Sequence, residues 1–425
     1  MQRMQTLARI GALSLLWGSA AFFILMPPHL ANAAPQATTR YVSPTGSNGT
    51  IAFGIPLLNF CTNVAKPCKT IKWAAETIAQ NGDTISLSAG TFTETITLAK
   101  NLTLRGKGTR KTIVDGALQG TVFTISQYAN VQLNKMRIQR GNGSSGGGIS
   151  VAGGATLTAK NVTLIDNQAN SGGAIVNYGT LNLDQVVLYR NHGTNNSGGG
   201  LANNGTATLT RTDIELNDAQ FGAAILNNGT LTITDSALHH NATPNGYPGI
   251  YNSNSGTLSL TNVTISHNTT NATALQGGAI SQVNGTATLN YVTITQNTQA
   301  HFGAIYAAQG SVKISNSIIY DNGASPQCGS ASIGVFSDGG YNVYADQSCS
   351  YWTGSGTLLA NPKLKALNYN GGFTPTHALK ASSPAIDLAP KNKCTAHDQR
   401  NVARPLDGNG DGKVRCDAGT FEFQP

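Results

Sequence analysis

Acidic and imidazole side chains stand at corresponding places in successive segments of this chain, each a few residues before an asparagine. Asp213 and Glu215 are one residue apart in an alternating segment, so both carboxylates would lie on the same side of a strand. A carboxylate pair can hydrolyse a glycosidic bond. His239 and His240, in the next segment, could act as general acid and base. These four residues are the candidate catalytic groups, and the simpler alternative for them is a solvated strand face.

Other segments carry different side chains at the same positions. They are Tyr189, Arg190, His267, Tyr320 and Asp321. This row mixes aromatic, basic and acidic groups, whereas the residues around it repeat. A varied row fits a contact surface for carbohydrate or protein better than one reaction centre, and we expect these five residues to form a ligand-binding face.

A calcium site is a further candidate near the C-terminus, in "DGNGDGKVRCD". Asp407, Asn409 and Asp411 have the spacing of alternate oxygen ligands in a calcium loop. The closing carboxylate expected at the twelfth position is an alanine, and Asp417 stands one residue early. A plain turn rich in Asp and Gly is the alternative. No cofactor is otherwise required by the sequence.

These residues sit within a repeat of about 25 residues. One marker is a small-small-apolar step and the other is a terminal asparagine. The asparagines are Asn167, Asn191, Asn217, Asn241, Asn268, Asn297 and Asn322. Apolar residues alternate inside each unit, as Leu231 and Ile233 do, which is the period of a strand and not of a helix. Three short strands in each unit predict an all-β parallel β-helix, and neither a helical nor a leucine-rich repeat fits.

Stacking of the coils explains why the same residue types recur in each unit. Inward apolar residues would form continuous columns that no single coil could bury alone. The glycines of the "NGT" and "YGT" steps are expected to provide sharp bends through positive φ; they are Gly179, Gly205, Gly229 and Gly285. The asparagine column is either a binding face or a ladder of hydrogen-bonded amides, and the ladder is favoured because buried amides are usually satisfied.

One helix is expected, before the repeats. Ile71, Ala74, Ala75 and Ile78 share one helical face, so a short amphipathic helix would close the open end of the stack. We assign residues 1–33 to a signal peptide, 34–92 to the N-terminal cap, 93–325 to the repeats and 326–425 to a C-terminal region.

The signal peptide prediction rests on Arg3 and Arg9, the apolar run at 10–26 and the small residues at 31–33. An uncleaved anchor is the alternative, and no later segment is long enough to span a membrane. Export permits disulfides. Local spacing favours three pairs: Cys61 with Cys68, Cys328 with Cys349, and Cys394 with Cys416. We therefore expect a secreted or cell-surface-associated protein.

The charge balance indicates which partners to expect. The chain has 27 basic and 19 acidic residues, a net charge of +8, and its basic residues are scattered without interleaved aromatics. This pattern suits an anionic polysaccharide or another cell-surface polymer better than nucleic acid. No feature demands an oligomer, and we expect a monomer.

Two parts of the chain resemble known families. The entry helix is similar to that of pectin-lyase-like right-handed β-helix proteins, and "GGAI" at 172–175 and 277–280 resembles the repeats of polymorphic outer-membrane proteins. The C-terminal region resembles the choice-of-anchor Q domain of secreted bacterial β-helix proteins. Its matching pieces are "NGG" at 370–372, "TPTH" at 374–377, "SPAID" at 383–387, "DQR" at 398–400 and "CDAGTFE" at 416–422. The resemblance implies a bacterial, secreted protein; that domain normally precedes an anchor, and no anchor follows here.

Two functions follow as hypotheses. The motifs typical of polygalacturonase-like hydrolases and of pectin methylesterases are absent, and the repeats show no obvious acidic cluster of the pectate lyase kind. The leading hypothesis is a non-catalytic binding or adhesion protein that contacts carbohydrate or a cell-surface polymer. The alternative is a polysaccharide lyase or glycoside hydrolase on the same fold.

Overall fold

The structure is a computed structural model that describes residues 36–52, 55–195, 198–243, 246–253, 256–270, 278–298, 303–323, 326–332, 335–349 and 354–425. The chain divides into two units, Met1–Gln36 and Ala37–Pro425. The predicted signal peptide at 1–33 lies outside the described residues. Among the residues that are described, none of the helices has both the length and the apolar character to cross a membrane.

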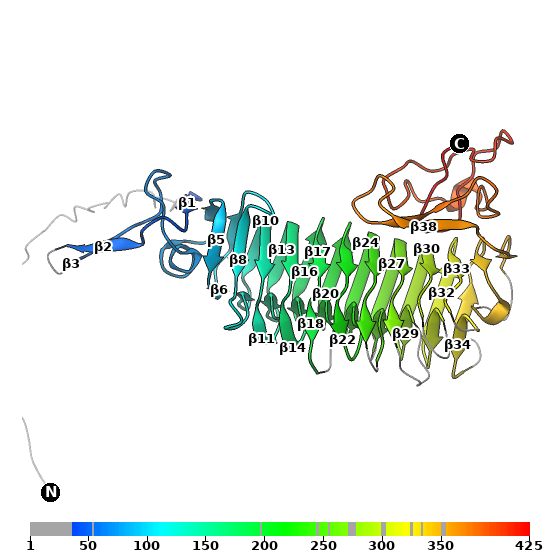
Figure 1. The fold of residues 1–425 in the computed structure, drawn as a ribbon, viewed down its shortest axis with the longest axis horizontal. Helices are drawn as coiled ribbons and strands as arrows, with labels where there is room; N and C mark the ends of the chain where they lie inside the picture. Colours follow the sequence, from blue (N-terminus) through cyan, green and yellow to red (C-terminus); the bar gives the residue numbers. More distant parts are fainter. Residues whose placement is uncertain are drawn as a thin grey trace, which may run out of the picture. The chain divides into compact units, whose positions relative to one another are not determined.

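The second unit is a parallel β-helix in which three sheets run along a stack of coils (Figure 1). Across the described ranges the largest sheet has 19 strands: β1 (Thr39–Val42), β4 (Thr84–Leu87), β5 (Gly90–Thr93), β7 (Leu102–Arg105), β8 (Thr112–Asp115), β10 (Asn130–Gln139), β13 (Thr156–Ile165), β16 (Thr180–Asp184), β17 (Val187–Tyr189), β20 (Thr206–Thr210), β21 (Asp213–Glu215), β24 (Thr230–His239), β27 (Thr257–Ser266), β30 (Thr286–Thr295), β32 (Ser311–Ser315), β33 (Ile318–Tyr320), β35 (Phe336–Asp338), β36 (Val343–Tyr344) and β37 (Leu358–Leu359). We refer to it as the large sheet.

The other two sheets complete each coil. The ten-stranded sheet contains β6 (Ile96–Leu98), β9 (Phe123–Ile125), β12 (Ile149–Val151), β15 (Ile175–Asn177), β19 (Leu201–Asn203), β23 (Ile225–Asn227), β26 (Ile250–Asn252), β29 (Ile280–Gln282), β31 (Ile305–Ala307) and β34 (Cys328–Ser330). The six-stranded sheet contains β11 (Asn142–Ser145), β14 (Gln168–Ser171), β18 (His192–Gly193), β22 (Asp218–Ala219), β25 (Ala242–Thr243) and β28 (Thr269–Thr270). These counts refer to the described ranges only.

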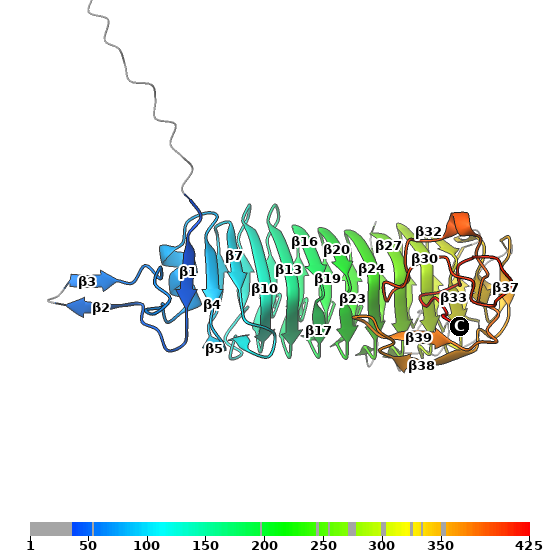
Figure 2. The ribbon, with the colours of Figure 1, turned by 90° about the horizontal axis from the view of Figure 1, so that it is seen from above.

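Strand register confirms the predicted apolar columns. In the large sheet Leu231 pairs with Leu258 and Ile233 with Leu260, in parallel, and all four side chains are buried. Each coil therefore covers the apolar residues of its neighbour, and the stack buries what one coil would expose. Figure 2 shows the coils following one another in sequence order along the axis.

Each coil turns two corners of the large sheet at non-glycine residues in the left-handed region. One corner column, with φ between 49° and 58°, is Arg140, Asp166, Arg190, Leu216, His240, His267, Gln296 and Asp321. The other corner column, with φ between 46° and 59°, begins with Lys135, Asn161, Gln185 and Arg211. This conformation is rare for residues with a Cβ, and the sequence pattern did not reveal it. Several side chains expected to carry function therefore stand at corners.

The terminal asparagines form the predicted hydrogen-bonded ladder and not a binding face. From Asn167 to Asn322 each side-chain amide donates to the amide oxygen one coil later, at 2.8 to 3.0 Å, and all are buried. The last donates to Gln327 at 3.0 Å. A second ladder, unforeseen, runs through Asn177, Asn203 and onward in the ten-stranded sheet.

The glycines of the "NGT" and "YGT" steps are needed for a different reason from the one predicted. Of the four, only Gly285 has a positive φ. At Gly205 a Cβ would lie 2.2 Å from the carbonyl oxygen of Gly179 in the preceding coil. The absent side chain thus permits close stacking of backbone on backbone, and the prediction of positive φ at Gly179, Gly205 and Gly229 was wrong.

The N-terminal end is closed as expected. A short helix, η1 (Trp73–Ile78), buries Ala74, Ala75 and Ile78 against the core, although its closing hydrogen bond, from Ala79 N–H to Ala74 C=O, spans five residues. The disulfide Cys61–Cys68 and the antiparallel hairpin of β2 (Gly49–Ala52) and β3 (Ile55–Leu58) belong to this end. Strand pairing extends on both sides of the predicted repeat range 93–325, since β1 and β36 lie in the large sheet.

The C-terminal region folds back onto the outer face of the large sheet. Its antiparallel hairpin, β38 (Leu364–Asn368) with β39 (Thr376–Leu379), lies over the later coils (Figure 1). Buried Ile318 and Val343 pack against Leu379 and Ile386. Two short helices, η2 (Gln347–Cys349) and η3 (Lys391–Lys393), adjoin the other predicted disulfides, Cys328–Cys349 and Cys394–Cys416, which are both present.

Candidate binding site

The candidate carboxylates lie together on β21, but they are not an open pair. Asp213 is 2% exposed because the C-terminal hairpin covers it. Its Oδ1 lies 2.9 Å from His239 Nε2, and its Oδ2 accepts a hydrogen bond of 2.9 Å from the Tyr369 hydroxyl. Glu215 is half-buried, with Oε2 at 3.8 Å from the same imidazole nitrogen. Burial, followed by the Asp213 charge, raises the pKa of Glu215.

A series of neighbouring histidine side chains continues from Glu215 along the stack of coils. Parallel pairing places Glu215 beside His239. His239 is buried, and its Nδ1 lies 2.8 Å from Nδ1 of exposed His240. His240 stacks on His267, one coil later, with ring centroids 4.7 Å apart. Burial, followed by the charge of His239, lowers the pKa of both His240 and His267. Both rings are therefore neutral at neutral pH.

The last imidazole of this series is His377 on β39 of the hairpin. Its hydrogen bonds define which ring nitrogen carries the proton. His377 Nδ1 lies 2.8 Å from the carbonyl oxygen of Lys365, so this nitrogen carries the proton. Burial lowers the pKa of His377 to about 4, and the ring is neutral. Its Nε2 therefore accepts from the Ser266 hydroxyl at 2.8 Å. The Ser266 oxygen then accepts from Nδ1 of His267 at 2.7 Å.

A cleft of about 330 Å³ opens between the hairpin and the last coils. One wall is the large sheet and its corner, with Thr295, Gln296, Tyr320 and Asp321. The other wall is the hairpin and the residues before it, with Lys363, Lys365, His377 and Lys380. Two residues of the predicted ligand face, Tyr320 and Asp321, thus line the cleft, and His267 stands beside it with its ring 6.0 Å from that of His377.

The other two residues of the predicted face lie apart from the cleft, several coils upstream. Arg190 forms an ion pair with Asp166 at 2.7 Å, and its guanidinium lies 5.1 Å from the ring of Tyr189. Both groups are engaged with their neighbours on the surface of the stack. The structure thus divides the predicted face into an upstream pair and the downstream cleft.

The predicted calcium residues are only partly together. Asp407 accepts backbone N–H bonds from Gly410 and Gly412, and Asp411 accepts one from Lys413. Asn409 accepts from the N–H of Asp411 at 2.9 Å. Asp417 is buried elsewhere. Among the described residues no group of three His, Cys, Asp or Glu side chains is arranged to hold a metal ion.

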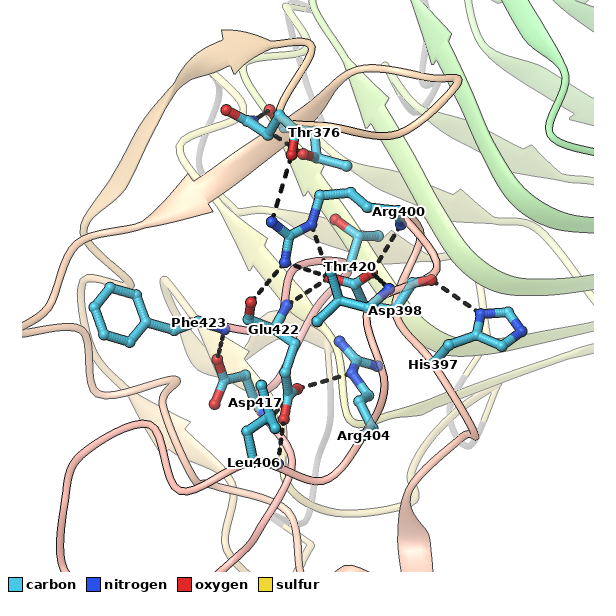
Figure 3. A network of polar contacts seen from close by, with 12 residues as sticks. Thr376, His397, Asp398, Arg400, Arg404, Leu406, Asp417, Thr420, Glu422 and Phe423 are labelled. Atoms are coloured by element: carbon cyan, nitrogen blue, oxygen red, sulfur yellow. Dashed lines mark hydrogen bonds and ion pairs between the residues drawn. The ribbon is translucent and has the colours of Figure 1, made fainter. Parts of the chain in front are cut away.

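A buried polar network fixes the C-terminal region in place (Figure 3). Arg404 donates to Glu422 at 2.8 Å with both side chains fully buried, and its guanidinium lies 4.3 Å from the ring of Tyr291 on β30. Burial, followed by the charge of Glu422, raises the pKa of Asp417 to about 7. Arg400 pairs with Asp398 at 2.6 Å. Through Arg404 and Tyr291 this network joins the C-terminal region to the sheet.

A second set of contacts joins this region to the strands directly. The Thr264 hydroxyl donates to Gln399 Oε1 at 2.7 Å, and the Thr420 backbone N–H donates to Thr293 Oγ1 at 3.0 Å. The two partners of the first bond are 135 residues apart. The sequence did not identify the lysines, Tyr369 or His377 as site residues. The histidine of "TPTH" was visible in the sequence, but nothing there placed it beside the coils.

Comparisons with known proteins agree with this architecture. Residues 201–349 match the family model described as a right handed beta helix region. A search of curated protein sequences finds no match. Among solved structures, the crystal structure of pectate lyase Pel9A aligns with a TM-score of 0.54 at 14% identity, over 91% of this chain and 96% of that one. The PL6 family alginate lyase AlyGC aligns with a TM-score of 0.36 at 13% identity, over 83% and 57%. At this identity the likeness to Pel9A concerns the fold alone: the chain is a right-handed parallel β-helix with the pectin-lyase-like fold.

Proposed function

We propose that this protein is an extracellular, non-catalytic binder of acidic polysaccharide, and that the cleft between the hairpin and the last coils holds the polymer. The observation that carries the proposal is the wall of three lysines, Lys363, Lys365 and Lys380. This narrows the ligand expected from the sequence, a carbohydrate or cell-surface polymer, to one that carries regular negative charges.

The charge of the cleft favours an anion. Lys365 and Lys380 form no ion pair within the described part of the chain, and Lys363 Nζ contacts only the Ser382 hydroxyl, at 3.1 Å. Among the described residues Asp321 is the one acidic residue that lines the cleft, and neutral His377 adds no charge. A concave site with an excess of one sign of charge concentrates ligands of the opposite sign.

The cleft also has features suited to a sugar. Tyr320 offers a half-buried ring, with an apolar face and a polar tip, against which a pyranose can pack. Exposed Gln296 adds a neutral hydrogen-bonding group. A pocket with one aromatic surface and a few fixed polar groups is typical of small-molecule and sugar sites.

The arrangement of the predicted catalytic residues supports binding without turnover. An acid or base must reach the proton that it transfers. Asp213 is buried with both oxygens engaged, and His239 is buried with both ring nitrogens engaged. These contacts tie the hairpin to the sheet and leave little of either group for a substrate.

A lyase remains the second candidate because of one observation. His240 and His267 are neutral imidazoles at the surface, and His267 adjoins the lysine cleft through His377. In β-elimination a neutral base removes the proton on the carbon next to the uronate carboxylate, and a lysine can stabilise the charge that develops there. A double bond then forms as the bond from the next ring carbon to the glycosidic oxygen breaks, and that oxygen leaves with the other part of the polymer. The two carboxylates proposed from the sequence, Asp213 and Glu215, would instead be the catalytic pair of a glycoside hydrolase.

The test is binding to a panel of uronate and neutral polysaccharides by affinity electrophoresis, with product analysis on the same samples. We expect uronate polymers to retard the protein, neutral polymers to leave it unaffected, and no products to form. Changing Lys363, Lys365 and Lys380 to Gln together should abolish the retardation. The matched control, Lys391, Lys393 and Lys413 to Gln, removes the same charge from exposed positions outside the cleft. Equal retardation of both variants would refute the cleft as the binding site. Unsaturated products would favour a lyase, and new reducing ends without unsaturation would favour a hydrolase.

Two further proposals stand from the sequence. The three disulfides and the apolar segment at 10–26 support secretion, and the resemblance of the C-terminal region supports a bacterial origin. Calcium binding at Asp407, Asn409 and Asp411 stays a proposal, now without Asp417. Calorimetric titration of the whole protein with calcium tests it, and the absence of heat would contradict it.

A further inference from the structure

A second hollow, of about 430 Å³, lies on the outer face of the large sheet at the upstream end of the hairpin. Its lining includes Lys107, Lys135, Asn161, Gln185 and Phe373. Four of these come from the early coils, while Phe373 comes from the loop between β38 and β39. Two parts of the chain more than 180 residues apart therefore build one hollow.

The lysine side of the hollow is held in place by backbone packing. Lys135 stands at a corner with φ of 56°, and its carbonyl oxygen accepts the Gly108 N–H at 2.9 Å. At Gly106 a Cβ would lie 2.2 Å from the same oxygen, so the loop that carries Lys107 packs closely on this corner. The backbone positions that carry the Lys107 and Lys135 side chains are therefore fixed relative to each other.

The aromatic side is fixed as well. Thr374, next to Phe373, is fully buried and donates to the carbonyl oxygen of Asp235 at 3.1 Å. Gln399 donates to the Thr374 hydroxyl at 2.9 Å. Tyr369, at the other end of the loop between β38 and β39, donates a hydrogen bond to Asp213. Phe373 is half-buried, and this anchored loop presents its ring to the hollow.

Several cations on the coils are compensated by an acidic neighbour. Arg190 pairs with Asp166, and both Lys160 and Arg211 pair with Asp184. Lys107 and Lys135 take part in no ion pair with any described residue. Their positive charge is therefore left uncompensated beside an accessible aromatic ring.

We infer that this hollow is a second subsite for a ring-bearing anion, a uronic acid residue of the polysaccharide, with the carboxylate on Lys107 and Lys135 and the sugar ring against Phe373. The inference rests on the proposed function, because it assigns the hollow to the same polymer. The amides of Asn161 and Gln185 supply hydrogen bonds for the sugar hydroxyls.

The spacing of the two sites allows one polymer chain to occupy both. Corner residues Lys135 and Gln296 are six coils apart along the stack, which corresponds to about 29 Å at about 4.8 Å for each coil. A polymer that bridges this distance gains affinity because its second contact becomes intramolecular. A short oligosaccharide cannot bridge the sites and would bind each of them separately.

Calorimetry with a trisaccharide and with a polymer of galacturonic acid tests the inference. Wild-type protein should bind two trisaccharides. The variant Lys107→Gln/Lys135→Gln should bind one and lose about tenfold or more in affinity for the polymer. Phe373→Ala should act in the same direction, and the control Lys391→Gln/Lys393→Gln should behave as wild type; thermal unfolding verifies that each variant folds.

The outcomes separate the inference from the proposal beneath it. If the Lys107/Lys135 variant keeps both the stoichiometry and the polymer affinity while the Lys363/Lys365/Lys380 variant loses binding, the second subsite is refuted and the cleft stands. If the wild type binds neither these ligands nor any other uronate polymer of the panel, the proposed function itself is refuted.

Discussion

The hydroxyl oxygen of Tyr369 lies 2.9 Å from Oδ2 of Asp213, although 156 residues separate the two along the chain. The other oxygen of this buried carboxylate is 2.9 Å from His239 Nε2. One carboxylate thus joins the tip of the C-terminal hairpin to two strands of the large sheet. One of the four candidate catalytic residues of the sequence thus serves as an attachment point for the hairpin.

Removing the Tyr369 hydroxyl should therefore weaken the attachment of the hairpin. The Tyr369 side chain is 58% exposed, but its hydroxyl reaches the buried carboxylate of Asp213. Partial burial, followed by the Asp213 charge, raises the pKa of Tyr369, so the hydroxyl remains a donor. Tyr369→Phe leaves a buried carboxylate with one partner fewer, which should cost about 1.5–3 kcal/mol of the free energy of unfolding. Urea denaturation measures this loss. Tyr128→Phe, at a side chain that is 77% exposed, is the control and should change little.

Acid should release the hairpin through His377. Burial lowers the pKa of His377 to about 4 in the folded protein, against 6.5 for an ordinary histidine. The unfolded chain therefore binds a proton before the folded chain does. Stability from neutral His377 is fully present above about pH 6.5 and falls as the pH drops to about 4, by roughly 3 kcal/mol in all.

Buried carboxyl groups oppose this trend, so a difference between variants is the quantity to measure. The pKa of Asp417 is raised to about 7, and this group adds stability as the pH falls from about 7 towards its ordinary range. His377→Gln keeps Asp417 but removes the imidazole. Urea denaturation between pH 7 and pH 4 gives the free energy of unfolding of both proteins. As the pH falls, the wild type should lose more stability than the variant, and the difference should match the His377 contribution of roughly 3 kcal/mol. Parallel pH curves for the two proteins would contradict it.

Interrupting the asparagine ladder should destabilise the stack. Asn241 donates to Asn268 Oδ1 at 2.9 Å and to Ile214 C=O at 2.9 Å, and it accepts from Asn217 at 3.0 Å, all in the buried interior. Asn241→Ala removes the acceptor of both the side-chain amide and the backbone N–H of Asn217, which should cost roughly 1–3 kcal/mol for each buried group. Asn268 Oδ1 keeps the backbone N–H of residue 241 as a donor, at 3.0 Å. Thermal unfolding detects the loss. Asn228→Ala removes the exposed bond to Asn204 and should cost much less.

The repetitive part of this molecule could be predicted from the sequence because its contacts repeat with the sequence. Leu231 meets Leu258 at the corresponding place of the next coil, so one alignment of the units predicts every inward column and the amide ladder. The cysteine pairs were predictable for a similar reason, since each is local. The left-handed corners were missed because residues as different as Arg190, His240 and Asp321 adopt them.

The site could be predicted only in part because it depends on contacts between distant, unrepeated segments. The pattern indicated that Asp213, Glu215 and His239 face outwards, and they do share one face of the large sheet. It could not show that the hairpin would cover Asp213, since Tyr369 and His377 lie beyond the last coil in sequence. Side chains expected in solvent are therefore buried, and the cleft lies beside them.

The central claim is that the lysine cleft holds an acidic polysaccharide, and a crystal structure with a bound oligogalacturonate tests it most directly. The account predicts a uronate carboxylate within hydrogen-bonding distance of at least one of Lys363, Lys365 and Lys380, with a sugar ring near Tyr320. An oligosaccharide bound only at another surface, with the cleft containing solvent alone, would contradict the account.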